Sequence, residues 1–156
     1  MRLYVWTNRY ISSIQKGIQT AHLVSDLMIK YLHPEATTDY WTRKAKGTLL
    51  EWACSHKTII VLDGGNCEAL LGVCRVLNDR NPYPWTSFSE DKESLNEALT
   101  VVGVVIPEGI YSRPERKDFE THREFQRAWK AWSFRENPKE IGYAIAGLIE
   151  KSHLAI

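Results

Sequence analysis

Residues 2–22 read RLYVWTNRYISSIQKGIQTAH and contain two different structural patterns in succession. The first six residues are aromatic and β-branched, which predicts a strand buried on both faces. Ser12 and Ser13 then supply hydroxyls suited to capping a helix N-terminus. Apolar residues recur at helical spacing beyond them until Pro34, which predicts a helix. The stripe expected to be buried is Ile14, Ile18, Ala21, Met28 and Leu32.

The rest of the chain alternates between the two patterns. Helices are predicted from a cap at 37–39 to about 56, and at 67–77, 115–135 and 138–152. Strands are predicted at 58–62, 85–88 and 99–106. Alternation of this kind produces a sheet covered by helices on both faces. We therefore expect one α/β domain, a three-layer α/β/α fold with a mixed sheet of about four strands and an added C-terminal helix pair.

Composition narrows the class of protein. A chain of 156 residues fits a single domain. Its 20 basic and 19 acidic residues give a net charge of +1, which excludes a strongly basic tail but not a local basic face. The N-terminus lacks the apolar segment of a signal peptide, and no run approaches the ~18 apolar residues of a membrane span. We expect a soluble, cytoplasmic protein without a membrane partner.

Motifs for common cofactors and metals are absent from the sequence. It contains no GxGxxG, GxxxxGK[ST], GxSxG or CxxC pattern, and its five histidines form no HxxxH pair. Gly64 and Gly65 follow an expected strand and precede an expected helix, where a phosphate could bind. A tight turn is the simpler interpretation of this pair. We therefore expect neither a metal ion nor a cofactor.

Three segments share their order and spacing with one enzyme family. In the first, LYVWT and a polar loop lead into Gln15-Lys16-x-x-Gln19-x-x-His22. The others are TIIVLDGGNCEALLGVCRVL at 58–77 and SEDKESLNEALTVVGVV at 89–105. Together they resemble the archaeal and eukaryotic-type peptidyl-tRNA hydrolases, most closely short phage-encoded relatives. The resemblance covers roughly 2–106, so we expect a hydrolase-like body at 1–107 and a helical extension at 108–156.

The resemblance also implies a set of site residues. Gln19 and His22 match the family's glutamine and histidine, and Thr100 matches the threonine that opens the last strand. Gln15 stands where the family has its catalytic lysine, and Lys16 follows it, about 100° further round the helix. The long side chain of a lysine there can still reach the site. The acidic-loop aspartate corresponds to one of three carboxylates, Asp91 first, with Glu90 or Glu93 as substitutes.

The implied reaction is hydrolysis of the ester that joins a peptide to the 3′ end of tRNA. It needs a positioned water, donors for the developing oxyanion and a carboxylate that orients the water or accepts its proton. The expected catalytic residues are the donors Lys16 and Gln19, the carboxylate of Asp91 and the supporting hydroxyl of Thr100. Gln15 and His22 are expected to bind, His22 by fixing the helix or a substrate phosphate.

The glutamine at position 15 motivates an alternative function. A catalytically impaired relative could bind tRNA, a nucleotide or a host protein, for instance as a phage counter-defence protein in the host cytoplasm. Without the resemblance, Gln15, Gln19 and His22 share one face of a helix beside its apolar stripe. There they suit an anion or carbonyl ligand. The alternative is a histidine at the edge of the core beside two solvent-exposed glutamines without a ligand.

The C-terminal extension carries a basic stripe and an aromatic stripe. Acidic residues interrupt the basic stripe, so a solvated helix with ion pairs is its default interpretation, and a tRNA-facing surface is the alternative. The basic candidates for tRNA binding are Arg123, Arg127 and Lys130. The aromatic stripe, which ends at Trp132, is more typical of a core than of a base-stacking platform. Small residues between 142 and 147 favour close packing, on the body or in a homodimer.

Overall fold

The computed structural model describes residues 1–33, 39–77, 81–111, 114, 116–136 and 140–155. The strands are β1 (Arg2–Thr7), β2 (Ile59–Asp63), β3 (Trp85–Ser89) and β4 (Leu99–Ile106). The helices are α1 (Ser13–Leu32), α2 (Tyr40–Glu51), the π-helical turn η1 (Trp52–His56), α3 (Cys67–Leu77), α4 (Lys92–Leu95), α5 (Glu108–Tyr111), the 3-10 turn η2 (Arg116–Asp118), α6 (His122–Glu136) and α7 (Glu140–Lys151). All four predicted strands are confirmed to within one residue at each end.

The strands form one mixed sheet in the order β2-β1-β4-β3. β1 pairs in parallel with β2 and antiparallel with β4, and β3 pairs antiparallel with β4. β4 is buried along its whole length, and β1 is buried except at Arg2. Continuous burial of this kind explains why both central strands are apolar at successive positions. The predicted α/β class with a mixed four-stranded sheet is therefore confirmed.

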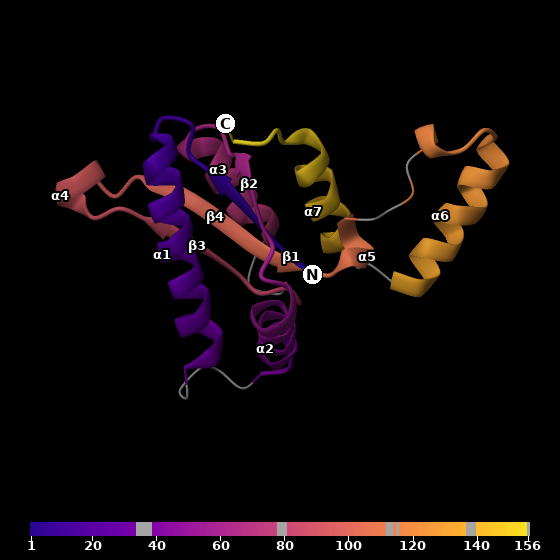
Figure 1. Cartoon of the computed structure of the whole chain (residues 1–156), viewed down its shortest axis with the longest axis horizontal. Coiled ribbons are helices and arrows are strands. Elements are labelled where there is room, and N and C mark those ends of the chain that lie inside the picture. The colour runs from indigo at the N-terminus through magenta and orange to yellow at the C-terminus, as the bar shows by residue number, and fades with distance from the viewer. Residues whose placement is uncertain (34–38, 78–80, 112–113, 115, 137–139, 156) are drawn as a thin grey trace.

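Helices cover both faces of this sheet (Figure 1). On one face, α1 and α2 pack around a core that includes Val5, Leu23 and Leu49. On the other face, α3, α5 and α7 pack around a core that includes Trp6 and Leu70. Successive side chains of a strand point to opposite faces, so Val5 and Trp6 belong to different layers. The result is the expected three-layer α/β/α arrangement.

The buried face of α1 differs from the predicted stripe. Ile14 is 78% exposed and Ile18 is 49% exposed, and Ala21 is exposed as well. Residues Gln19, Thr20, Leu23, Leu27 and Tyr31 are buried instead. α1 approaches β4 closely at Gly103, where any Cβ atom would overlap the Leu23 side chain. The prediction was wrong because this segment carries two apolar stripes, and the fit of the leucines against β4 selects between them.

The last helix belongs to the core of the body. Ile145 and Ala146 of α7 pack in the same cluster as α3, and Gly142 is buried one turn earlier. After α7, the hydroxyl of Ser152 accepts a hydrogen bond from the Trp6 indole at 2.8 Å. The small residues therefore allow close packing of α7 on the body of the protein. The predicted start of this helix, residue 138, lies outside the described residues.

Helix α6 begins later than the predicted residue 115. Thr121 and Glu124 form a capping box, in which each backbone N–H donates to the other side chain, at 3.0 and 3.2 Å. The preceding residues form α5 and η2, which no sequence pattern indicated. Trp132 is buried and donates its indole N–H to the Gly109 carbonyl at 2.6 Å, so this end of the aromatic stripe is a packing contact. Figure 1 shows α6 set apart from the sheet, beyond α5.

Replacement of Ile145 tests the assignment of α7 to the core. Its side chain is fully buried, so Ile145→Ala should lower the free energy of unfolding by about 2–5 kcal/mol. The matched control is Ile14→Ala, at an exposed position of another helix, with an expected change below about 0.5 kcal/mol. Urea denaturation followed by tryptophan fluorescence measures both variants. Equal effects would contradict the core position of α7.

Candidate functional site

Several expected site residues gather at the sheet edge where β1 and β2 end. α1 and α3 begin at this edge, β3 ends there and β4 begins alongside. Ligands of open α/β sheets bind at the carboxyl ends of the parallel strands. The backbone N–H of Asn8, just after β1, donates to the carbonyl of Thr100 at 2.8 Å. The start of β4 thus lies against the loop that leads into α1.

A buried chain of hydrogen bonds links β4, α1 and the acidic loop. The hydroxyl of Thr100, a residue only 1% exposed, donates to Gln19 Oε1 at 3.3 Å and lies 3.2 Å from the Phe88 carbonyl. Gln19 is 4% exposed and donates through Nε2 to Oε1 of Glu90. An amide that accepts from a hydroxyl and donates to a carboxylate is held in one orientation. The structure therefore brings Gln19 and Thr100 together and orients a carboxylate beside them.

Glu90 is the acidic-loop residue whose carboxylate meets Gln19. The β3–β4 ladder shifts register at the end of β3, and such a bulge redirects the residues that follow. The backbone N–H of Glu90 donates to the Ala98 carbonyl at 3.1 Å, and Glu97 N–H donates to the Asp91 carbonyl at 3.2 Å. The loop is closed by these bonds with Asp91 exposed. Of the three carboxylates that the resemblance left open, Glu90 is the one whose contact with Gln19 the structure describes.

Gln15 caps its own helix. The hydroxyl of Ser12 accepts from the Gln15 backbone N–H at 3.2 Å, and Gln15 Oε1 accepts from the Ser12 N–H at 2.9 Å. This reciprocal pair is a capping box, for which Ser-x-x-Gln is the sequence signal. The side chain expected to bind a ligand is thus bonded to the backbone at the start of α1.

His22 attaches α1 to β3. Its ring stacks on Phe88 with centroids 4.8 Å apart and an angle of 9° between the planes. His22 is exposed, and it lies about one turn after Gln19 on α1. This contact fits the first of its two expected roles, that of fixing the helix.

Asn8 is a buried polar residue that the sequence analysis missed. Its Nδ2 donates to the Leu99 carbonyl at 3.2 Å and to Cys67 Sγ at 3.3 Å, and its Oδ1 accepts from the Tyr10 N–H at 3.0 Å. Asn8 therefore joins the β1–α1 loop to β4 and α3. A polar residue directly after a buried strand is the signal that could have found it.

Two basic side chains, Arg9 and Lys16, lie near the ends of β1 and β2. Arg9 forms an ion pair with Asp63 at 3.0 Å, between the ends of β1 and β2. The pKa of Asp63 is lowered, mainly by the Gly65 N–H that donates to it at 2.8 Å and further by Arg9 and the charge of Lys16, against an opposing effect of burial. Lys16 therefore faces the same edge of the sheet. Gly65 has φ 75°, which fits the tight-turn interpretation of the Gly64-Gly65 pair.

The basic residues of α6 form a separate surface. Arg123, Arg127 and Lys130 are exposed on that helix. Figure 1 shows α6 and the start of α1 at opposite ends of the molecule. The structure thus does not bring these three expected binding residues to the site at Gln19 and Thr100.

Removal of the Thr100 hydroxyl tests the buried hydrogen-bond chain. Thr100→Val keeps the shape of the side chain but leaves Gln19 Oε1 without its donor, so the free energy of unfolding should fall by about 1–3 kcal/mol. The control is Thr48→Val, whose hydroxyl bonds to a carbonyl within its own helix, with an expected change below about 0.5 kcal/mol. Urea denaturation measures both. A Thr100→Val protein as stable as the wild type would show that these buried hydrogen bonds do not stabilise the fold.

The lowered pKa of Asp63 predicts a dependence of stability on pH. A carboxyl whose pKa is lower in the folded state stabilises the fold above its unfolded pKa of ~3.9, and this contribution is lost as the pH falls through the folded value. Asp63→Asn should therefore be less stable than the wild type at pH 7, and the difference should disappear once the pH falls below the lowered pKa of Asp63 in the folded state. Thermal melts at a series of pH values measure it. A difference that stays constant with pH would exclude the carboxylate as its source.

The described residues also lack two kinds of feature. No group of three or more His, Cys, Asp and Glu side chains among them could hold a metal ion. No helix in the described part of the chain has the length and apolar character needed to cross a membrane.

No protein-family model matches the chain, and no curated protein matches it. Support for a function therefore comes from the side chains of the site.

Proposed function

We propose that this protein hydrolyses the ester of peptidyl-tRNA and so releases the peptide. The observation that carries the proposal is the Glu90 carboxylate, oriented by Gln19 and Thr100 at the carboxyl edge of the sheet. An oriented carboxylate beside an amide donor, with a lysine one turn earlier on the same helix, suits acid–base hydrolysis. The substrate class comes from the resemblance of three ordered segments to peptidyl-tRNA hydrolases.

Glu90 acts as the general base in this proposal. Its Oε1 accepts the hydrogen bond from Gln19, and Oε2 takes a proton from a water molecule. The water oxygen bonds to the ester carbonyl carbon, and the bond from that carbon to the ribose oxygen then breaks. The proton held by Glu90 passes to the leaving ribose oxygen, so the carboxylate is regenerated.

Gln19 and Lys16 stabilise the oxyanion that develops on the carbonyl oxygen. An amide nitrogen carries two N–H groups, and the bond from Gln19 to Glu90 uses one of them. Lys16 lies about one turn earlier on α1 and adds a positive charge. The first turn of α1 contributes its positive dipole end as well. Thr100 holds Gln19 so that its donor is already aimed before the reaction begins.

A second candidate is binding of tRNA without hydrolysis, and Gln15 favours it. The residue in the position of the family's catalytic lysine is engaged as a helix cap, so it cannot replace that lysine. Arg9 and Lys16 would then serve to hold phosphates at the same edge. A nucleotide or a host protein as ligand, with a counter-defence role, is a variant of this candidate.

Release of the amino acid from N-acetyl-aminoacyl-tRNA by the purified full chain tests the proposal. Glu90→Gln should lower kcat about 10²–10⁴-fold, because it removes the base. Lys16→Ala should lower kcat about 10²–10³-fold, because it removes an oxyanion donor. Circular dichroism checks that each variant is folded.

Two matched variants act as controls. Asp91→Asn changes the adjacent exposed carboxylate, and Lys44→Ala changes an exposed lysine of α2, and both should keep nearly full activity. Loss of activity in Asp91→Asn but not in Glu90→Gln would contradict the role of Glu90. A wild-type protein that binds the tRNA, with an affinity that falls as salt rises, but leaves the ester intact would establish the second candidate.

A further inference from the structure

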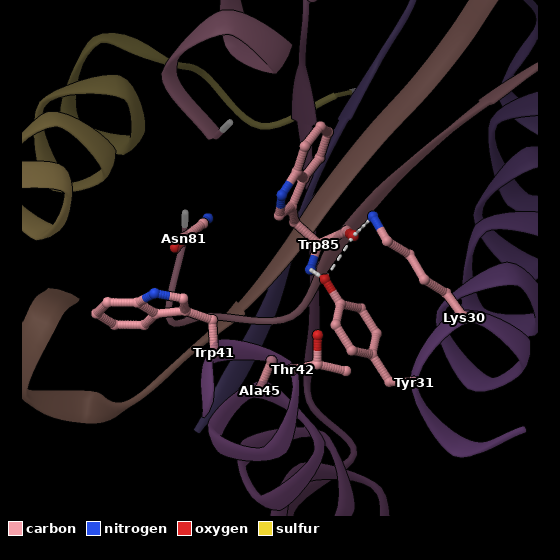
Figure 2. A pocket seen from close by; sticks show the side chains of 7 residues that line it. All are labelled: Lys30, Tyr31, Trp41, Thr42, Ala45, Asn81 and Trp85. Carbon is pink, nitrogen blue, oxygen red and sulfur yellow. Dashed lines mark hydrogen bonds between the residues drawn. The ribbon is translucent and has the colours of Figure 1, made fainter. Parts of the chain in front are cut away.

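A pocket of about 200 Å³ lies between the end of α1, the start of α2 and the loop before β3 (Figure 2). Figure 2 shows Trp41 and Asn81 on one side, Lys30 and Tyr31 on the other, and Trp85 between them. Its volume is below the ~300–1,000 Å³ typical of pockets for drug-sized ligands. A single flat ring system is therefore the size of ligand that the pocket suits.

Asn81 presents an unpaired donor in this pocket. The residue is 4% exposed, and its Oδ1 accepts from the Tyr83 backbone N–H at 3.1 Å, which fixes the orientation of the amide. Among the described residues, Asn81 Nδ2 has no hydrogen-bond partner. Figure 2 shows this nitrogen turned toward the Trp85 indole. Because buried N–H groups are nearly always paired, the pocket favours a ligand that carries an acceptor.

Three of the residues that line the pocket are aromatic, and two of them, Tyr31 and Trp85, are bonded to each other. Tyr31 Oη bonds to both the carbonyl and the N–H of Trp85, each at 3.2 Å. Lys30 Nζ donates to the same carbonyl at 3.0 Å and lies 4.7 Å from the centroid of the Trp85 ring. The half-buried indole of Trp41 comes from α2 on the other side. Indole faces stack on flat heteroaromatic rings, and every nucleobase offers such a face.

We propose that this pocket binds a nucleobase. The base stacks on the indoles of Trp41 and Trp85, and an acceptor atom of the base accepts a hydrogen bond from Asn81 Nδ2. The attached phosphate lies near the Lys30 ammonium. The base belongs either to a free nucleotide or to an unpaired nucleotide of RNA, which share this chemistry. The pocket is separate from the hydrolytic site, because Lys30 and Lys16 are about 20 Å apart along α1 at ~1.5 Å per residue.

Isothermal titration calorimetry of the full chain tests this proposal with AMP in one arm and hexa-adenylate RNA in the other. Saturable binding is expected. Asn81→Leu removes the donor at similar volume and should weaken binding about tenfold or more. Trp41→Leu removes one stacking wall and should also weaken it about tenfold. The control Tyr10→Leu alters an exposed aromatic residue outside the pocket and should leave the affinity unchanged.

The two arms distinguish the source of the base. AMP bound as tightly as the RNA supports a free nucleotide, and RNA bound more tightly, with an affinity that falls as salt rises, supports an RNA base. Absence of saturable binding of the RNA and of AMP, GMP, CMP and UMP up to millimolar concentration overturns the proposal. So does wild-type affinity in both Asn81→Leu and Trp41→Leu, whose folding is checked by thermal melts. Ester hydrolysis by Asn81→Leu should match the wild type, so the outcome is separable from the proposed function.

Discussion

β1 and β4 pair antiparallel at the centre of the sheet, and both are buried on both faces over nearly their whole length. Successive side chains along these strands therefore point into alternate helical layers. The register of the strands determines which of their residues each helix contacts. The pairing of Thr7 with Val101 also brings the end of β1 beside the start of β4. Asn8 and Thr100 meet for this reason, and the loop that leads into α1 begins there. The candidate site depends on this pairing.

Gln19 occupies a position that an apolar residue could fill. Burying an amide costs free energy unless both of its ends are hydrogen-bonded, and Gln19 meets this condition through Thr100 and Glu90. A buried polar chain that is fully bonded is rigid, whereas a half-bonded one destabilises the fold. This series of hydrogen bonds ends at the Glu90 carboxylate, which is only half-buried. It lies at the edge of the sheet where the basic residues Arg9 and Lys16 also lie. This combination of rigidity and access favours a functional over a purely structural interpretation.

The two C-terminal helices differ in their relation to the body. α7 completes the core on one face of the sheet, and the segment after it returns to β2, where Leu154 forms a bridge with Leu62. α6 instead contacts the body through the bond from Trp132 to Gly109 and through ring contacts of Trp129 and Trp132 with Tyr143 of α7. Its residues Arg123, Arg127 and Lys130 are exposed. The boundary expected at residue 107 therefore does not separate a complete body from an addition, because the body includes α7.

Local sequence patterns are enough to predict the strands, most of the helices and the layered class, because runs such as 99–106 and the helical spacing of apolar residues in 67–77 involve only neighbouring residues. The sequence also contains the capping signal at Ser12, whereas it predicts too early a start, at residue 115, for the helix that begins at His122. Tertiary packing, in contrast, selects which stripe of α1 is buried, because the choice depends on the fit of Leu23 at Gly103 of a distant strand. It likewise decided that Glu90 meets Gln19, because a bulge in the β3–β4 ladder sets the direction of that loop. The pocket at Asn81 joins the consecutive helices α1 and α2 to a loop about 40 residues further along the chain, and tertiary packing brings that loop to them.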